Sequence, residues 1–153
     1  LTTLTADEFV DWGHEGTYVT AIGVGECAGV VIDLVATLLL ESEEKIEWAN
    51  KAFDNSQYAD AIYHAYSAFV WTAKALLLDK GVNASTQTAV INEFDARYVQ
   101  EGLFSFPTSF AERVLQINKY EPSKEFAEVF IKQATAFYYE AAERRESLRV
   151  VNS

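Results

Sequence analysis

Apolar residues recur in this chain at the three- and four-residue spacing of amphipathic helices. One such stretch runs from residue 26 to residue 53, with acidic side chains on the face expected to meet solvent. A second runs from residue 58 to residue 77, after Asn55-Ser56, which offers an N-cap, and stops at Gly81, a natural helix-ending residue. Because the connection between them is short, the two stretches are predicted to form an antiparallel hairpin.

Three further helices are predicted downstream of the hairpin. One covers residues 86–100, with Val90, Ile91, Phe94 and Tyr98 on its inward face, and ends at Gly102. Ser109 and Ser123 are expected to cap a short helix and a long last helix. No internal repeat or second domain is visible in the sequence. The pattern therefore predicts an all-α antiparallel bundle of about five helices over residues 26–153, after a glycine-containing lead-in segment, residues 1–25.

Charge and cysteine content exclude several function classes. The chain has 12 Lys+Arg against 23 Asp+Glu, a net charge of −11, whereas nucleic acids and anionic membranes both attract basic surfaces. We therefore expect neither nucleic acid nor membrane as a partner. The 1 cysteine excludes an internal disulfide and a multi-cysteine metal or iron–sulfur site in this chain. A reducing compartment fits that cysteine usage, and a cytoplasmic location is expected.

Two other features bear on how the chain assembles. It contains no Met and starts at Leu1, so we expect it to be a fragment of a longer protein. Aromatic residues make up 14% of the chain, and an excess of aromatics is typical of interfaces as well as of cores. A homodimer is expected, with the rest of a longer parent chain as a second candidate partner.

The glycine-rich segment Gly23-Val24-Gly25-Glu26-Cys27-Ala28-Gly29 is the most unusual stretch of the sequence. Its glycine spacing is close to that of a dinucleotide-binding turn, in which backbone N–H groups meet a pyrophosphate. However, the first helix is followed by another helix, so the strand–helix–strand unit that the motif requires is missing. The Glu26 carboxylate would also occupy the phosphate position. The segment is a candidate ligand turn, and the alternative is that its glycines only allow two chain segments to approach closely. Cys27 is interpreted as a small buried hydrophobe in preference to a nucleophile.

Asp33 and Lys74 form a candidate buried polar pair. Asp33 interrupts the apolar run of the first long helix, and Lys74 lies in an equally apolar part of the second. An unpaired charge in such surroundings is costly. We therefore prefer an interhelical ion pair, or a hydrogen bond from Asp33 to a tyrosine, to a carboxylate tuned for acid–base chemistry.

A candidate polar and aromatic face is predicted on the second long helix. Asp60 and His64 are four residues apart and therefore share one side of the helix, close to Tyr63 and Tyr66. A carboxylate-bridged metal pair in a bundle would need a Glu-x-x-His sequence on two helices. Because the other histidine is His14 in the glycine-rich segment, no metal site is expected, and His64 is interpreted as a packed or rim histidine.

The stretch from residue 58 to residue 102 resembles the HEPN family of small helical domains. The likeness consists of a Tyr/Ala-rich helix that ends in Ala73-Lys74-Ala75-Leu76-Leu77, a Gly turn, a polar loop, and a short helix with Phe94 and Tyr98. Many HEPN domains are dimeric, metal-independent ribonucleases that use an Arg-x4–6-His motif on a late helix. In this chain every arginine follows His64, so none can start the motif. The resemblance therefore implies a non-nucleolytic member without a catalytic residue.

The front of the chain, with Asp11-Trp12-Gly13, Tyr18 and the glycine-rich segment, resembles nitrite/sulfite reductase-type chains that carry such a helical domain at the C-terminus. That resemblance implies sirohaem and an iron–sulfur cluster, held by four cysteines, in a longer parent chain. No cofactor is expected in the present one. The leading interpretation is a non-catalytic accessory domain for dimerisation or docking in a sulfite/nitrite reductase-type protein. The alternative is a free-standing HEPN-type ribonuclease or nucleotide-binding protein.

Overall fold

The structure of this chain is a computed structural model, which describes the backbone of residues 27–152 and the side chains of residues 34–145. Within this part all regular secondary structure is helical, as predicted. The α-helices are α2 (Cys27–Asp54), α3 (Tyr58–Asp79), α4 (Gln87–Phe94), α5 (Phe110–Val114) and α6 (Lys124–Asn152). A π-helix, η2 (Asp95–Val99), continues α4, and a 3₁₀ helix, η3 (Leu115–Asn118), continues α5.

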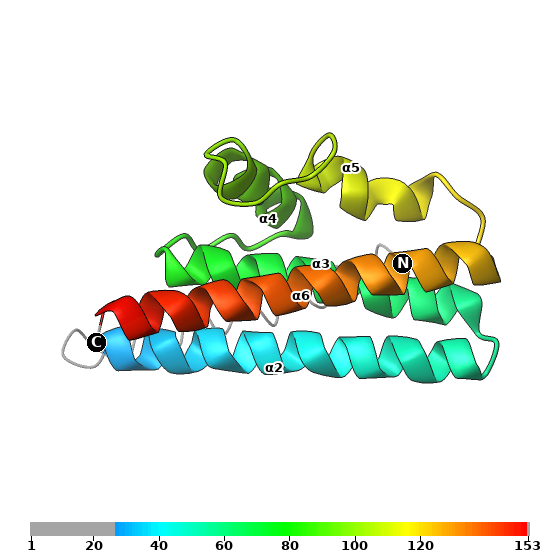
Figure 1. Cartoon of the computed structure of the whole chain (residues 1–153), viewed down its shortest axis with the longest axis horizontal. Coiled ribbons are helices and arrows are strands. Elements are labelled where there is room, and N and C mark those ends of the chain that lie inside the picture. The colour runs from blue at the N-terminus through cyan, green and yellow to red at the C-terminus, as the bar shows by residue number, and fades with distance from the viewer. Residues whose placement is uncertain (1–26, 153) are drawn as a thin grey trace.

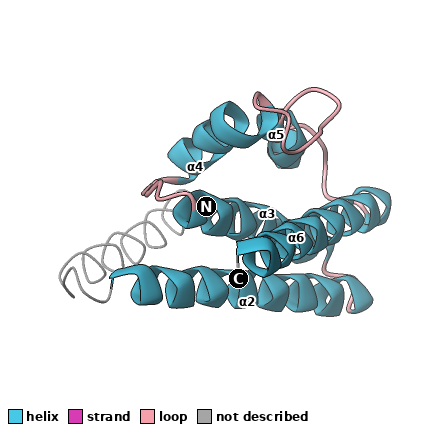
Figure 2. Ribbon diagram, turned by 60° about the vertical axis from the view of Figure 1, so that its left-hand side comes forward, coloured by secondary structure: helices cyan, strands magenta, loops and turns pink. Residues whose placement is uncertain are grey.

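Three long helices form the base of the molecule, and the short helices lie over it (Figure 1). Helices α2 and α3 form the predicted antiparallel hairpin, and α6 packs against both of them. Helix α6 runs in the same direction as α3, because α4 and α5 return the chain to the far end of the bundle (Figures 1 and 2). The C-terminal end of α3 therefore lies beside the last turns of α6. No helix within residues 27–152 is long and apolar enough to cross a membrane.

The start of α3 differs from the prediction. Its N-cap residue is Gln57, which makes no side-chain capping bond, so the capping role predicted for Asn55-Ser56 is wrong. The tight reversal after α2 is the reason: Ser56 adopts a left-handed backbone with φ 62°, and the Gln57 N–H donates to the Ala52 carbonyl at 2.8 Å. The turn is therefore closed by backbone–backbone hydrogen bonds, which the search for side-chain capping residues does not predict.

The end of α3 is the predicted glycine stop. Gly81 has φ 81°, its N–H donates to the Leu78 carbonyl at 2.9 Å, and the Val82 N–H donates to the Leu77 carbonyl at 2.9 Å. These two bonds form a Schellman motif, which needs the left-handed conformation that glycine adopts without strain. The motif makes Lys80 the C-cap residue of α3.

The predicted third helix is present, but its second half is wound as a π-helix. Thr86 caps its start by accepting from the Ala89 N–H at 3.0 Å. At the start of the π-helix η2, the Asp95 carboxylate accepts from the N–H groups of Phe110 at 2.7 Å and Ala111 at 3.0 Å. These bonds tie η2 to the start of α5. The caps predicted at Ser109 and Ser123 are confirmed, since each hydroxyl accepts a backbone N–H three residues ahead.

Aromatic rings fill the centre of the molecule. Phe69 of α3 lies 5.4 Å from Phe130 and 5.6 Å from Phe137 of α6, measured between ring centroids, and Phe94 lies 4.6 Å from Phe110. All five side chains are buried. Much of the aromatic excess is therefore core, although Trp48, Tyr120 and Tyr139 remain exposed.

Candidate functional site

The glycine-rich candidate turn falls outside the described part of the chain. Gly23, Gly25 and Glu26 precede residue 27, while Cys27 and Gly29 belong to the first turns of α2 by their backbone. The Cys27 side chain lies outside the described residues as well. The ligand turn therefore stays a prediction.

Lys74 is buried, as predicted, and its Nζ donates to the Ala84 carbonyl at 2.7 Å. This bond fastens the loop between α3 and α4 to the middle of the bundle, and a hydrogen bond from a charged donor contributes about 1.5–3 kcal/mol. The Asp33 side chain lies outside the described residues. The Asp33–Lys74 pair stays a prediction.

The structure places Asp60, Tyr63, His64 and Tyr66 on α3, and we call this set the His64 face. The His64 ring lies 6.0 Å from Tyr63 and 6.3 Å from Trp48 of α2. Its Nδ1 is buried with no hydrogen-bond partner among the described residues. Burial, followed by the positive charge of Lys45, lowers the pKa of His64, against a smaller opposite effect of Asp60. His64 is therefore a packed, neutral histidine near neutral pH.

The Tyr66 side chain serves a structural contact. Its hydroxyl donates to Gln87 Oε1 at 2.6 Å, which connects α3 to the first residue of α4. Asp60 is exposed in the first turn of α3, where a carboxylate interacts favourably with the helix dipole. Among the described residues no three His, Cys, Asp or Glu side chains are grouped to hold a metal ion. The contacts of the His64 face are those of a packed surface.

A cavity of about 680 Å³ lies where α3 ends beside α6, and we call it the end cavity. Four chain segments line it: the end of α3, the π-helix η2, the loop that follows η2, and the second half of α6. Its apolar floor consists of Leu76, Tyr98, Leu103 and Phe104. Its charged rim consists of Asp79, Lys80, Glu140, Glu143, Arg144 and Arg145.

The floor of the end cavity is held by Tyr98. Its buried hydroxyl donates to the Leu76 carbonyl at 2.6 Å. Burial, and secondarily the negative charge of Asp79, raises the pKa of Tyr98, so the hydroxyl stays protonated and keeps donating. The Tyr98 carbonyl accepts the N–H groups of Leu103 at 2.8 Å and Phe104 at 3.2 Å, across a turn in which Gly102 has φ 78°. The π-helix and this turn therefore bring the loop onto the floor.

Two cations lie over the aromatic rings of the floor. Lys80 Nζ lies 4.4 Å from the centroid of the Tyr98 ring, and Arg144 Cζ lies 4.4 Å from that of Phe104. The two rings are themselves 5.8 Å apart. Such cation–π contacts each contribute about 0.5–1 kcal/mol at exposed sites. They hold two positive charges over adjoining rings of one cavity.

The arginines of the rim face carboxylates. Arg145, whose side chain is 7% exposed, has its Nε 3.6 Å from Asp79 Oδ1, and this contact joins α6 to the end of α3. Arg144 Nε lies 3.4 Å from Glu140 Oε2, one helical turn earlier. Among the described residues no ion pair involves Lys80 or Glu143.

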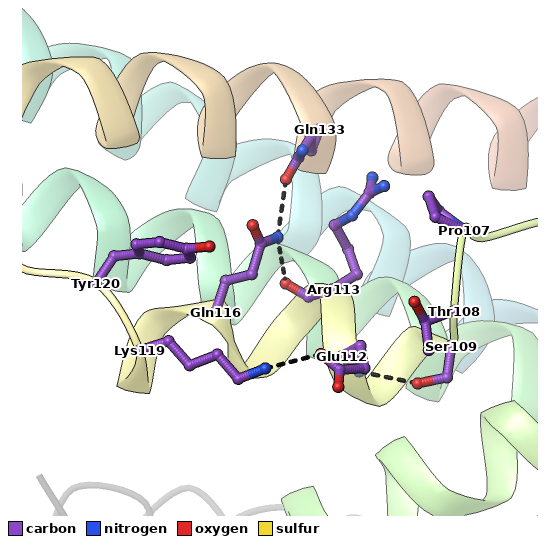
Figure 3. Close-up of a pocket in the computed structure, with 9 residues that line it drawn as sticks. All are labelled: Pro107, Thr108, Ser109, Glu112, Arg113, Gln116, Lys119, Tyr120 and Gln133. Carbon is purple, nitrogen blue, oxygen red and sulfur yellow. Dashed lines mark hydrogen bonds and ion pairs between the residues drawn. The ribbon is translucent and has the colours of Figure 1, made fainter.

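A second, smaller pocket of about 220 Å³ lies between the α5–η3 segment and α6 (Figure 3). Its side chains bind one another: Lys119 Nζ lies 2.9 Å from Glu112 Oε2, and Gln116 donates to the Arg113 carbonyl at 2.8 Å and to Gln133 Oε1 at 3.2 Å. Figure 3 shows Gln116 of η3 extending toward Gln133 of α6. This bond holds η3 against α6. Because the polar groups of this pocket already bind one another, the end cavity is the stronger candidate for a ligand site.

Comparison with known proteins places this arrangement in a family. The sequence profile of the HEPN domain matches residues 35–145, which include every residue that lines the end cavity. The chain belongs to the HEPN family. It is also 38% identical over 68 residues to "Putative toxin MJ0605" of Methanocaldococcus jannaschii, an alignment that covers 44% of this chain and 51% of that protein. This chain thus aligns with about half the length of that relative. No solved structure matches.

The HEPN domain has functional candidates that the sequence analysis did not identify. Lys80, Phe104 and Arg144 are 24 and 40 residues apart in the chain, and nothing in their spacing joins them. Tyr98 was predicted to point inward, which the structure confirms, but its place beneath Lys80 was not predicted. Grouping these residues from the sequence would have required knowing that α3 and α6 run in the same direction.

Proposed function

We propose that this HEPN domain acts by association with a partner and does not cut RNA. The observation that carries the proposal is the order of two residue types along the chain. Both histidines, His14 and His64, precede the first arginine, Arg97. The Arg-x4–6-His arrangement of the nucleolytic members therefore cannot be formed by this chain in the usual order.

The surroundings of His64 support the same proposal. A histidine that donates or accepts protons in catalysis needs a pKa near the working pH and access to the substrate. Burial and Lys45 lower the pKa of His64, and its ring contacts are with Trp48 and Tyr63. These contacts favour a packing role.

Exposed large side chains support association with another protein surface. Trp48 on α2 is 50% exposed and Tyr139 on α6 is 57% exposed. Aromatic residues are enriched at protein interfaces because they bury much area with few rotatable bonds. We propose that these helices contact a second copy of the chain or the remainder of a longer parent chain. A sulfite/nitrite reductase-type parent, with sirohaem and an iron–sulfur cluster elsewhere, stays part of this proposal.

A second candidate function is favoured by the relative named as a toxin. On that reading the chain is a free-standing HEPN-type ribonuclease or nucleotide-binding protein. Cleavage would then need an arrangement other than the usual motif, and Arg144 and Arg145, on the rim of the end cavity, are the arginines to test.

The deciding experiment is an RNA cleavage assay on the purified full chain, in the presence of a metal chelator. We expect no cleavage of single-stranded RNA above the background of the Arg144→Gln and Arg145→Gln preparations, which control for contaminating nucleases. Lys132→Gln, at an exposed lysine outside the end cavity, is the matched charge-removal control. Cleavage that persists in Lys132→Gln and is lost in Arg144→Gln or Arg145→Gln would overturn the proposal in favour of the second candidate.

The association itself is tested by sedimentation equilibrium of the same preparation. We expect a mass twice the 17.1 kDa of one chain, and a shift toward the single-chain mass in Trp48→Ser or Tyr139→Ser. A mass of one chain at all concentrations would overturn dimerisation. In that case co-purification with a longer parent chain is the remaining form of association.

A further inference from the structure

We propose that the end cavity binds a small amphiphilic organic anion, with an acyl or aryl body on the apolar floor and a single carboxylate or similar group at Lys80 and Arg144. This inference goes beyond association with a protein partner and stands independently of it. The cavity volume of about 680 Å³ is in the range of small-molecule sites, which span roughly 300–1,000 Å³.

The floor offers an apolar surface and little hydrogen bonding. Leu76, Tyr98 and Phe104 are 3–6% exposed, so they present packed faces, and Leu103 at 37% exposed stands at the edge. The Tyr98 hydroxyl is already engaged with the Leu76 carbonyl. A ligand on this floor therefore gains by burying apolar area, and ligand sites typically combine such a lining with a few polar groups.

The cations of the rim decide the sign of the ligand charge. An aromatic floor could in principle attract a cation, because the ring face is electronegative. Here Lys80 and Arg144 already lie over the faces of Tyr98 and Phe104, each 4.4 Å from the ring centroid. A ligand cation would be repelled by both, whereas an anionic group is attracted to both. Lys80 also has no carboxylate partner among the described residues.

The carboxylates that line the cavity limit the affinity without reversing the preference. Asp79 faces Arg145 and Glu140 faces Arg144, so Arg144 divides its charge between Glu140 and a bound anion. Lys80, which pairs with no carboxylate among the described residues, supplies the remaining positive charge. Glu143 makes no ion pair among the described residues and opposes an approaching anion. Replacing Glu143 by Gln is therefore expected to strengthen binding, the opposite sign to replacing Lys80.

The test uses the full chain and the fluorescent probe anilinonaphthalene sulfonate, which combines an aryl body with one negative charge. Octanoate, octanol and inorganic phosphate then compete for the probe. We expect octanoate to displace it at least about tenfold more effectively than octanol, as the loss of one charge-assisted contact implies, and phosphate not to displace it. Equal displacement by octanol and octanoate would overturn the anion site, and displacement by phosphate alone would overturn the apolar one.

Variants locate the site. Lys80→Gln and Arg144→Gln should each weaken octanoate competition by about tenfold, and Glu143→Gln should strengthen it. Lys51→Gln is the matched control, because Lys51 Nζ also lies over a ring, 5.4 Å from Trp48, away from the cavity. Equal effects of Lys51→Gln and Lys80→Gln would overturn the assignment.

The apolar part has its own matched pair. Leu103 and Leu115 are both 37% exposed, but Leu103 lines the cavity and Leu115 does not. Leu103→Ser should weaken binding of the probe and of octanoate, and Leu115→Ser should leave both unchanged. Unfolding curves of all variants check that each one keeps the fold. Because RNA cleavage is measured separately, failure of this inference is distinguishable from failure of the proposed function.

Discussion

The His64 face and the end cavity lie on opposite halves of α3 and use the same kinds of side chain. On the first, Trp48 and Tyr63 flank His64, and Lys51 lies 5.4 Å from the Trp48 ring. On the second, Lys80 and Arg144 cover Tyr98 and Phe104 at 4.4 Å. The His64 face is made by one helix and its direct neighbour, whose side chains contact one another. The end cavity is made by four segments, and a hollow remains between them.

This difference shows that residue types alone do not make a site. Neighbouring side chains on packed helices fill the space between them. Asp60 and His64, one turn apart on α3, therefore leave no hollow for a ligand among the described residues. A hollow arises where chain segments from different elements end or turn together. The Schellman motif at Gly81 and the turn at Gly102 both lie at such a place.

The largest expected difference between the two regions is the stability lost when an aromatic side chain is removed from each. Phe104, 3% exposed, contacts Phe94, Tyr98 and Phe137, so Phe104→Ala should lower the free energy of unfolding by about 3–5 kcal/mol. Trp48→Ala, at a side chain that is 50% exposed, should cost clearly less. Urea denaturation measures both. Equal losses would mean that the loop after η2 is not packed as described.

Asp95 and Asp60 give the next largest contrast. The Asp95 carboxylate accepts two backbone N–H groups at the start of α5, so Asp95→Ala should cost about 1–2 kcal/mol, as loss of a helix cap does. Asp60→Ala, at an exposed position in the first turn of α3, should cost less than about 1 kcal/mol. The same denaturation experiment compares them, and a larger cost at Asp60 would contradict the contacts described for the π-helix.

Alkaline pH should lower the stability that Tyr98 contributes at the end cavity. Tyr98→Phe removes the hydrogen bond to the Leu76 carbonyl and should cost about 0.5–1.5 kcal/mol at neutral pH. Folding raises the pKa of Tyr98 above its ordinary value of about 10, so its contribution is complete below pH 10 and is lost as the pH rises further. The stability gap between wild type and Tyr98→Phe should therefore narrow above pH 10. A gap that stays constant up to the pH limit of folding would contradict this.

Acidic pH should act, more weakly, on the His64 face. Folding lowers the pKa of His64 below its ordinary value of 6.5, so the stability contributed by the neutral ring is present above that pH and is lost as the pH falls through the lowered value. His64→Gln should lose less stability than wild type between neutral and mildly acidic pH. Thermal unfolding at several pH values measures the difference.

Nuclear magnetic resonance titration of the His64 ring gives the same pKa directly, with His14→Gln as the assignment control. Lys45→Gln should raise the pKa of His64, and Asp60→Asn should lower it further, because these are the two charges that act on the ring. A pKa at or above 6.5 in the wild-type chain would show that the ring is not buried as described.

Local patterns predicted the helices well because each helix depends on its own residues. The hairpin of α2 and α3, the stop at Gly81 and the caps at Ser109 and Ser123 all follow from periodicity and short-range hydrogen bonding. The two local errors have a shared cause. Around Ser56 and in the π-helix, backbone and tertiary hydrogen bonds replaced the expected side-chain cap and regular α-helix.

The sequence by itself determined the helical class, most helix ends, the burial of Lys74 and Tyr98, and the order of histidines and arginines that bears on catalysis. The tertiary structure decided that α3 and α6 run in the same direction and that Lys80 and Arg144 meet over adjoining rings. The physical reason is range. A helix forms from contacts three and four residues apart, whereas the end cavity depends on how the chain returns through α4 and α5 before α6 begins.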